Sequence, residues 1–533
     1  MLNLLLVIWF LLSIAALVLG IRHTLHMFQL NSYQYQGYGR YMRTHKVQTL
    51  FPLVGLVLYG VILSGILQKN AAYAVILLFV SMAFFAGLCV LYWPRKAKKK
   101  LAVTARVKRL IVTSVLVALL VALLSYVVVT MLPTNKGNVW WGIDAAVILV
   151  PALSAYIVLL ANWCNIPVEK AVKQYYINDA KRLLKSCPDL KIIGITGSYG
   201  KTSVKYYLHT LLSAGFDVLM TPESYNTPMG VVMTIRGSLK ATHQIFLCEM
   251  GARHVGDIKE ICDIVDPQMG VITSLGYQHL ETFKSLENIV GTKKELFDAL
   301  PVGGPRFING DNEYVKQFGV NQGAITYGLE EGNTYRAFDL EYSEKGAKFK
   351  VQAPDGCVEE YQTKLLGEHN VVNITGAIAV AHELGIPMEK LKMPVRRLEG
   401  APHRLQPIVK GNNIIIDDAY NSNPNGANMA IKTLGMFQGV RVLVTPGMVE
   451  LGAQEDQANF ELGANATKYC DYIVLVGKKT TESLKKGVES TDFPRDKFYV
   501  AENFQDAMNF VYGIQTGEKL IVLLENDLPD NYL

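Results

Sequence analysis

The chain has 533 residues, of which 50% are hydrophobic and only 18% are charged. This length predicts three or more domains, and so apolar a composition, with a positive mean hydropathy, predicts that one of them lies in a membrane. The formal net charge of +6 gives no reason to expect a nucleic-acid partner, because the excess lies in short loops beside the apolar segments. The seven cysteines form no Cys-x-x-Cys pair, which argues against a zinc ribbon and is typical of reduced thiols in the cytosol.

Five apolar runs in the first third of the chain predict five transmembrane helices. Each approaches or exceeds the roughly 20 residues that cross about 30 Å of hydrocarbon. The first run lacks the basic start and the small-residue cleavage site of a signal peptide, so we expect it to be retained. The runs lie near residues 2–21, 50–67, 72–93, 110–132 and 143–162.

Positive charge in the loops predicts the orientation of these helices. Segments 22–46 and 95–109 carry four and eight Lys or Arg residues, whereas the alternate loops carry only Lys69 and Lys136. The N-terminus is therefore expected outside, and everything after about residue 163 in the cytoplasm. The loop 23–43 interleaves aromatic and basic residues, which suits contact with lipid headgroups, although such loops more often only set the topology.

Beyond the membrane region, the pattern changes to alternating strands and helices. Residues 165–188 are amphipathic and predict a helical linker. Short apolar runs at 192–196, 244–249, 269–274 and 306–309 predict buried strands of a parallel sheet, and 335–365 predicts an antiparallel hairpin. After a hinge near 398–404, runs at 413–417, 441–445, 472–477 and 519–524 predict a second α/β sheet in a domain of about 130 residues.

A glycine-rich segment follows the first of these strands and opens a helix. Residues 194–203 read Gly-Ile-Thr-Gly-Ser-Tyr-Gly-Lys-Thr-Ser, with Ile195 where the strict phosphate-loop pattern has its first glycine. Such a turn cradles phosphate with main-chain N–H groups, while Lys201 reaches the β/γ-phosphates and Thr202 holds Mg²⁺. The sequence therefore predicts ATP and Mg²⁺ as cofactors, against the plainer alternative of a turn that only caps a helix. The predicted phosphate-binding residues are Gly197, Ser198, Gly200, Lys201, Thr202 and Ser203.

Two further residues are placed for metal chemistry. Glu249 ends the strand 244–249, so its carboxylate should lie at the same sheet edge as the phosphate loop, where a Mg²⁺ ligand is needed. The alternative is a carboxylate that caps the next turn. His279 follows the strand 269–274, and alone it would be read as a packed or surface histidine.

The order and spacing of nine motifs resemble the Mur ligase family, most closely the MurF type that adds D-alanyl-D-alanine to a UDP-muramoyl peptide. The resemblance covers about residues 190–525. Besides the phosphate loop, the motifs are Thr221-Pro-Glu-Ser-Tyr-Asn-Thr-Pro-Met-Gly230, which looks like the family's substrate-facing loop, and the segments 249–254, 273–283, 291–297, 367–373, 402–404, 417–424 and 447–452.

This resemblance implies a fold of three parts and an acyl-phosphate mechanism. An α-helical transmembrane domain (1–165) would precede a Mur-type α/β P-loop ATPase domain (166–402) and a C-terminal Rossmann-like α/β domain (403–533). Lys201, His279, Lys293 and Arg404 would be catalytic. Thr202, Glu249, His279 and Lys293 would hold metal, with Lys293 carbamylated and Lys294 as the alternative. Asn370 would contact adenine, and Arg404 and Asp418 would reach the nucleotide from the C-terminal domain.

Two departures from the family leave the substrate open. Membrane helices stand where relatives carry a UDP-binding domain, and the chain ends Glu525-Asn-Asp-Leu-Pro-Asp-Asn-Tyr-Leu533 where a Lys-Gly-Ser-type segment is expected. We expect a multi-pass protein of a bacterial plasma membrane, with cytoplasmic catalytic domains, that joins D-Ala-D-Ala or a similar amine to a UDP- or lipid-linked cell-wall precursor. A poly-γ-glutamate-type ligase is the alternative, and a non-catalytic membrane scaffold is a remote one.

Overall fold

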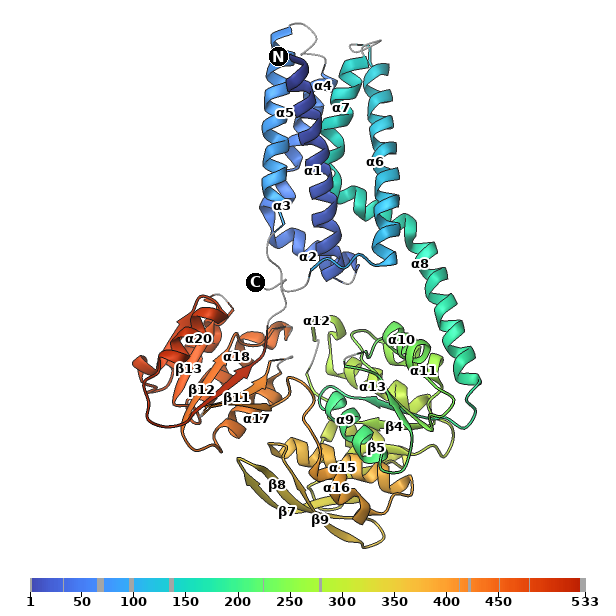
Figure 1. Ribbon diagram of the computed structural model, residues 1–533, viewed down its shortest axis with the longest axis vertical. Helices are drawn as coiled ribbons and strands as arrows, with labels where there is room; N and C mark the ends of the chain where they lie inside the picture. The colour runs from blue at the N-terminus through green and yellow to red at the C-terminus, as the bar shows by residue number, and fades with distance from the viewer. Residues whose placement is uncertain are drawn as a thin grey trace. The chain divides into compact units, whose positions relative to one another are not determined.

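The computed structural model describes residues 2–31, 33–64, 71–94, 100–133, 139–223, 225–277, 280–411, 413–419, 423–449, 451–478 and 480–527. The chain forms two compact units that divide between Gln174 and Tyr175 (Figure 1). This division falls within one helix, and the predicted domain limits at 165/166 and 402/403 stay predictions.

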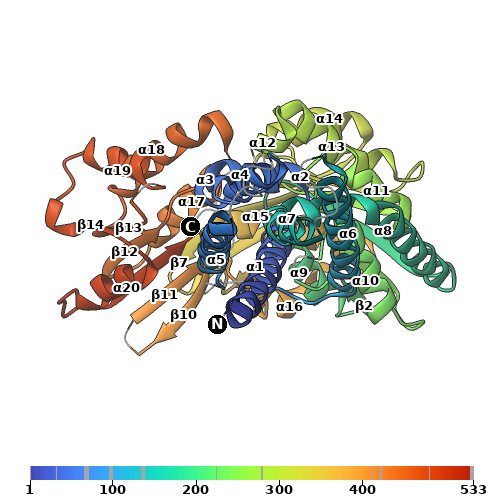
Figure 2. The same ribbon diagram turned by 90° about the horizontal axis from the view of Figure 1, so that it is seen from above.

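The N-terminal unit is helical. Helices α1, α5, α6 and α7 run side by side (Figures 1 and 2). The elements are α1 (Leu2–Leu30), α2 (Tyr35–Thr44), α3 (Lys46–Leu50), α4 (Leu53–Leu63), α5 (Ala71–Leu91), α6 (Ala105–Met131), α7 (Val139–Ala152) and α8 (Ser154–Lys185).

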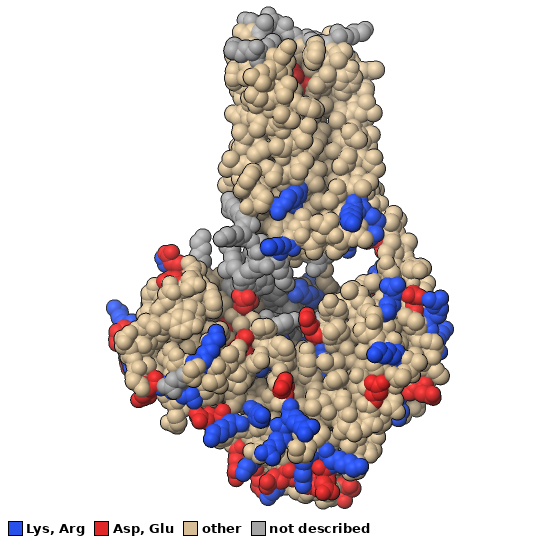
Figure 3. All heavy atoms as spheres, viewed as in Figure 1, with Lys and Arg blue, Asp and Glu red and all other residues tan. Residues whose placement is uncertain are grey.

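By length and composition, these helices are apolar enough to span a membrane. Four segments qualify singly, Asn3–Leu30, Lys46–Leu63, Ala72–Leu91 and Ala105–Met131, and the pair α7 and α8, bent by 75°, would make a fifth. On the face drawn in Figure 3, most of the bundle shows few charged side chains, and Lys and Arg gather at one end.

Three details differ from the sequence prediction. The fifth run is bent and not straight, since Pro151 lies in the last turn of α7 and removes a helix hydrogen bond there. The predicted linker 165–188 is no separate element but the second half of α8, which continues through Pro167. The predicted loop 23–43 is largely helical, because α1 extends to Leu30 and α2 begins at Tyr35.

The second unit contains a nine-stranded sheet in the order β2-β3-β1-β4-β5-β6-β7-β8-β9. The pairs from β2 to β7 in this order are parallel, and β8 and β9 extend the sheet through antiparallel pairs, β7 with β8 and β8 with β9. The strands are β1 (Lys191–Thr196), β2 (Val218–Met220), β3 (Ile245–Glu249), β4 (Met269–Ile272), β5 (Arg306–Asn309), β6 (Ile325–Gly328), β7 (Tyr335–Ser343), β8 (Gly346–Gln352) and β9 (Val358–Thr363).

Four of these strands confirm the predicted ones, whereas the hairpin prediction at 335–365 is wrong in extent. The segment forms three strands and joins the main sheet, because β7 pairs with β6. The helices are α9 (Lys201–Leu212), α10 (Pro228–Ser238), α11 (Asp257–Val265), α12 (Leu280–Phe283), α13 (Leu286–Asp298), α14 (Glu313–Gly319), α15 (Glu368–Glu383) and α16 (Lys392–Arg396).

Apolar residues on both faces of the sheet hold the helices in place. Alternation along β1 sends Ile193 and Ile195 to one core, with α9 and α15, and Ile192 to the other, with α10, α11 and α13. Because both faces are covered, only the ends of the parallel strands remain for a site.

A second sheet of six strands follows, in the order β10-β11-β15-β12-β13-β14. All pairs are parallel except β10 with β11. Its strands are β10 (Gln406–Lys410), β11 (Asn413–Asp418), β12 (Val440–Thr445), β13 (Tyr472–Val476), β14 (Phe498–Ala501) and β15 (Leu520–Glu525), and its helices are α17 (Pro424–Leu434), α18 (Glu455–Ala466), α19 (Glu482–Glu489) and α20 (Phe504–Gly513). The four predicted strands are confirmed, and β10 and β14 are additional.

Candidate active site

The glycine-rich turn links β1 directly to α9. Gly197 and Gly200 have φ values of 152° and 81°. A Cβ atom at Gly197 would lie 2.0 Å from Thr273 Oγ1, and one at Gly200 would lie 2.9 Å from Asn373 Oδ1. Both glycines are therefore required by backbone conformation and by close packing. The turn leaves the first N–H groups of α9, at Lys201–Ser203, without intrahelical acceptors, as a phosphate cradle needs.

Ser198, which we predicted to bind phosphate, is hydrogen-bonded within the protein, and its role at a phosphate stays a prediction. Its N–H donates to Ser274 O at 2.8 Å and its Oγ to Gly276 O at 3.0 Å. These bonds fix the turn to the segment after β4, so Ser198 shapes the cradle.

The Lys201 side chain folds back over the turn. Its ammonium donates to Gly197 O at 2.8 Å and to Ser198 O at 3.1 Å. Burial lowers the pKa of Lys201 to about 8. The negative charge of Glu249 raises this pKa and the positive charge of Arg404 lowers it, but burial has the largest effect. The cation thus lies inside the loop that a phosphate would enter.

Glu249 lies at the end of β3 with both carboxylate oxygens engaged. It is 1% exposed. Oε1 accepts from Thr202 Oγ1 at 3.0 Å and from Asn226 Nδ2 at 3.1 Å, and Oε2 lies 2.9 Å from Lys205 Nζ. Among the described residues, Oε2 has no aligned hydrogen bond besides this ion pair. Two hard oxygen donors 3.0 Å apart, from Thr202 and Glu249, fit Mg²⁺.

Lys293 and Lys294 are neighbours in α13 with opposite surroundings. Lys293 is 3% exposed, and burial together with the charge of Lys201 holds its pKa well below the ordinary value. No described side chain forms a hydrogen bond or ion pair with its amine. Lys294 is 40% exposed and lies 3.8 Å from Asp298. His279, the other expected metal ligand, lies outside the described residues.

Asn370, the expected adenine contact, is buried in the first turn of α15. Its Oδ1 accepts from Tyr207 OH at 2.7 Å, and its Nδ2 donates to Leu366 O at 2.7 Å. Both amide atoms therefore already have protein partners. Asn373, one turn further on, packs against Gly200 and was not singled out by the sequence analysis. His369 was missed too: burial lowers its pKa to about 4, and its Nδ1 has no hydrogen-bond partner in the described part of the chain.

Arg404 and Asp418 lie together at the start of the second sheet. Asp418 ends β11 and accepts from the N–H of Leu405 at 3.2 Å. Burial raises its pKa to about 6, against the lowering effect of Arg404. His403 and Leu405, on either side of Arg404, have φ values of 58° and 43°, so this turn is strained. Strain of this kind fits the hinge expected here.

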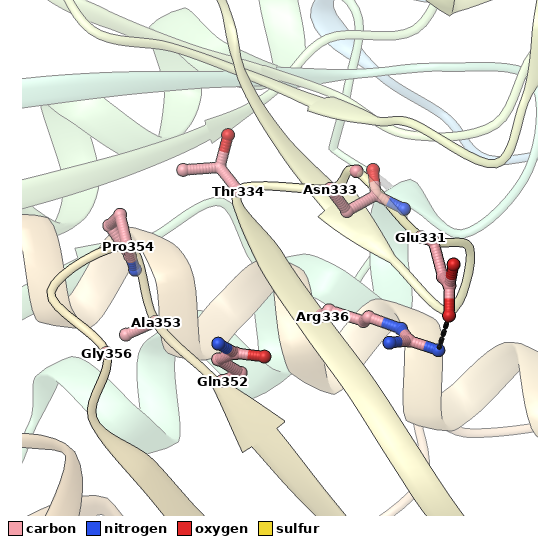
Figure 4. A pocket seen from close by; sticks show the side chains of 9 residues that line it. Glu331, Asn333, Thr334, Arg336, Gln352, Ala353, Pro354 and Gly356 are labelled. Atoms are coloured by element: carbon pink, nitrogen blue, oxygen red, sulfur yellow. Dashed lines mark ion pairs between the residues drawn. The ribbon is translucent and has the colours of Figure 1, made fainter.

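Two cavities among the described residues lie elsewhere and are lined by none of the predicted site residues. Figure 4 shows one of about 360 Å³ beside β7 and β8, where Arg336 pairs with Glu331 at 3.4 Å. The other, of about 530 Å³, lies beside α18 and α19. The site is thus the sheet edge that joins Lys201, Thr202, Glu249 and Lys293.

Comparison with known proteins identifies the chain's family. Residues 195–381 match the Mur ligase middle domain, and residues 403–524 match the Mur ligase, glutamate ligase domain. The UDP-N-acetylmuramoyl-tripeptide–D-alanyl-D-alanine ligase of Haemophilus influenzae is 30% identical over 348 residues, 64% of this chain and 72% of that protein. The chain belongs to the Mur ligase family.

Other members of this Mur ligase family match over a smaller share of their length. The ligases of the same description from Escherichia coli and Bacillus subtilis are 30% and 31% identical over 54% and 51% of this chain, which spans 65% and 60% of their lengths. A crystal structure of MurF from Acinetobacter baumannii aligns with a TM-score of 0.61 at 27% identity, over 67% of this chain and 78% of that one. The predicted resemblance is confirmed, and neither matched domain includes the N-terminal helices.

Proposed function

We propose that this chain is a membrane-anchored, ATP-dependent amide ligase of the MurF type. The observation that carries the proposal is the set of Lys201, Thr202, Glu249 and buried Lys293 at one sheet edge, in the order of the Mur ligase motifs. A non-catalytic scaffold would have no need to keep beside a phosphate loop a buried amine that, among the described residues, has no hydrogen-bond or ion-pair partner.

The phosphate loop and its neighbours would bind ATP. The N–H groups of α9 and the Lys201 ammonium would hold the phosphates, and Arg404 and Asp418 would reach the nucleotide from the second sheet. Mg²⁺ would be held by Thr202 and Glu249, and when bound it neutralises charge on the transferring phosphoryl group. The Asn370 amide, with both atoms already engaged, would serve adenine through its remaining lone pair and N–H.

Lys293 would complete a second metal site together with His279. Burial lowers the pKa of Lys293 and so favours the uncharged amine, which is the form that adds to CO₂. The product is a carbamate with the loss of one proton, and its oxygens suit a hard cation. Lys294 is instead 40% exposed and lies 3.8 Å from Asp298.

The reaction would proceed in two steps. A carboxylate of the acceptor attacks the γ-phosphorus of ATP, which gives an acyl phosphate and ADP. An uncharged amine then attacks the acyl carbon, phosphate leaves, and the amine loses a proton as the amide forms. Positioning and charge stabilisation supply the rate, so the preorganised cations matter more than any nucleophile of the protein.

The N-terminal helices would anchor the enzyme in a bacterial plasma membrane, with the N-terminus outside and the catalytic unit in the cytoplasm. Long exposed apolar helices and basic residues at one end of the bundle support this placement. By the MurF resemblance, the acceptor would be a peptide-bearing cell-wall precursor and the amine D-Ala-D-Ala or a similar one. Because membrane helices precede the matched domains, the acceptor would be either UDP- or lipid-linked.

A substrate screen tests the proposal. Full-length protein in lipid nanodiscs is given ATP and one of three acceptors, UDP-muramoyl tripeptide, its lipid-linked counterpart or glutamate, each with and without D-Ala-D-Ala. We expect phosphate release and a new amide, detected by mass spectrometry, only when a muramoyl acceptor and the amine are both present. Product with glutamate alone would replace the proposal by a poly-γ-glutamate-type ligase, and no product with any pair would refute it.

A further inference from the structure

Lys205 in α9 and Glu249 in β3 form a fully buried ion pair. Their side chains are 0% and 1% exposed, and Nζ lies 2.9 Å from Oε2. In four other ion pairs, Arg109–Glu169, Arg236–Asp179, Lys392–Glu359 and Arg441–Asp471, both side chains are partly exposed. The proposed ATP chemistry gives Lys205 no role.

Stability alone does not explain this pair. The free energy lost when two charges leave water is about as large as the free energy gained from their attraction. Apolar residues of similar volume therefore often stabilise the fold equally well. A buried pair is better explained by the geometry that it enforces.

The geometry concerns the carboxylate that would hold Mg²⁺. Thr202 and Lys205 are three residues apart and therefore lie on one face of α9. Thr202 reaches Oε1 at 3.0 Å and Lys205 reaches Oε2 at 2.9 Å. Glu249 is thus held at both oxygens by one helix and cannot rotate.

The same ammonium holds the loop 221–227, which belongs to the substrate-facing motif. Lys205 Nζ donates to the carbonyl oxygen of Glu223 at 2.5 Å. Glu223 has a φ of 42°, a left-handed conformation that a non-glycine residue adopts only when its surroundings impose it. The loop also reaches Glu249 from the other side, because Asn226 Nδ2 donates to Oε1 at 3.1 Å.

We infer that Lys205 is a positioning residue that couples the metal–nucleotide site to the acceptor-facing loop. A cation bound between Thr202 and Glu249 would be coordinated by Oε1 of Glu249. This is the atom that now accepts a hydrogen bond from Asn226, so the cation would compete with Asn226. Lys205 meanwhile keeps Oε2 and the main chain of Glu223 in place. Metal–nucleotide binding therefore moves the Asn226 end of the loop about a fixed point at Lys205. This inference rests on the proposed function for its metal and nucleotide.

A tryptophan in the loop reports this coupling without any acceptor. The five native tryptophans all lie within residues 1–163, so Tyr225→Trp adds the first one to the catalytic unit. Tyr225 is 39% exposed, which leaves room for the larger ring. In full-length protein we expect Mg²⁺ with ATP to change the emission of this tryptophan, and ATP with EDTA to leave it unchanged. An emission that ignores Mg²⁺–ATP would overturn the inference, whatever the variants below do.

The variant that tests Lys205 is Lys205→Met, in the Tyr225→Trp background. We expect the emission change to disappear and the Mg²⁺-dependent gain in ATP affinity, measured by calorimetry, to fall about tenfold, with Mg²⁺-free affinity within twofold of wild type. A matched control is Lys392→Met, which removes another lysine ion pair, with Glu359, 43% and 21% exposed. It should change neither quantity.

Two results would contradict the inference. One is a full emission response and a normal gain in ATP affinity in folded Lys205→Met; the other is an equal loss in Lys392→Met. If Lys205→Met fails to fold, Asn226→Ala replaces it, because it cuts the moving contact but keeps the buried pair, and should also abolish the emission change. The measurements need no acceptor, so a failed ligase screen with intact coupling would refute the proposed function alone.

Discussion

The two units of the chain differ in how far their large apolar side chains are exposed. In α6 of the N-terminal unit, Leu116, Leu119 and Leu123 are 60%, 62% and 58% exposed, whereas Leu208, Leu211 and Leu212 in α9 of the catalytic unit are 0% exposed. In water each exposed leucine would cost on the order of 1.5–3 kcal/mol relative to burial. The difference fits the proposed membrane placement, with hydrocarbon around the first unit and water around the second.

The comparison also separates what each unit can do. The catalytic unit holds ionisable side chains in its interior, among them Lys205, Glu249 and Lys293, where low dielectric strengthens their interactions. The described part of the bundle carries its basic residues mainly at one end, where lipid phosphate would meet them. Chemistry should therefore fail when the catalytic unit is changed, and membrane contact when the bundle is changed.

Loss of Lys201 is the most severe change expected. Lys201→Ala should lower ligation by on the order of 10²-fold or more, since a preorganised cation cannot be replaced by water in a closed site. Membrane association and the circular dichroism spectrum should be unchanged. Turnover near the wild-type rate would show that the phosphate loop is misassigned.

Truncating one leucine in each unit tests the solvent difference directly. Leu208→Ala should lower the unfolding free energy of the catalytic unit by about 2–5 kcal/mol, because it leaves a cavity in a packed core. Leu119→Ala should change the stability of the bundle by less than about 0.5 kcal/mol, because lipid fills the space. The N-terminal transition can be followed by tryptophan emission and the catalytic one by its ATP-dependent midpoint. Equal destabilisation would place α6 in a protein interior.

The pair Lys293 and Lys294 tests the metal-site assignment. Lys293→Ala should lower activity by about 10–100-fold, since it removes a metal ligand, and a small carboxylic acid, but not bicarbonate, should restore part of it. Lys294→Ala should be mild. A reversed pattern would move the carbamate to Lys294, and indifference of both variants would remove it from the mechanism.

The sequence alone predicted most of the α/β fold, and it named the four residues that the candidate site brings to one sheet edge, whose roles stay predictions. The parallel strands could be predicted because each is a short run with buried apolar residues at its centre, and the phosphate loop because glycine and lysine have fixed spacing there. Strands β2 and β10 were missed because one has three residues and the other, Gln-Pro-Ile-Val-Lys, is a polar edge strand with a proline. The linker predicted at 165–188 was not seen to continue the last apolar run, yet α8 spans both and passes through Pro167.

Residues that act through others were harder to predict. Lys205 looks like a solvated lysine of an amphipathic helix, and only its spacing from Thr202 hints that it faces the metal site. Asn373 has a similar signal, three residues after Asn370. Which partner such a side chain meets depends on tertiary packing, which no local pattern contains.

A pH profile sharpens the role of the Lys201 charge. Its pKa of about 8 means that the ammonium is present below that pH and is lost above it. We expect kcat/KM for ATP to fall up to tenfold for each pH unit above about 8. The residual kcat/KM of Lys201→Ala should not show this fall above about pH 8. A wild-type profile that stays flat to pH 9.5 would contradict the buried position of the ammonium.

The smallest expected effect concerns the bundle. Arg40→Ala/Arg43→Ala should lower kcat/KM several-fold for a lipid-linked acceptor, since each basic residue near an anionic surface contributes about 1 kcal/mol, and should leave a UDP-linked acceptor unaffected. Equal kcat/KM values for both acceptors in both proteins would indicate that the helices serve only as an anchor and do not recognise the acceptor.

The central claim is that an acceptor carboxylate is activated by phosphoryl transfer from ATP. The direct measurement uses the acceptor and amine that give the most amide in the substrate screen, with the reacting carboxylate labelled with ¹⁸O. Attack of that carboxylate on ATP and its displacement by the amine leave one carboxylate oxygen on phosphate. The account predicts one ¹⁸O atom in the released phosphate for each amide formed. Unlabelled phosphate beside the amide product would contradict it.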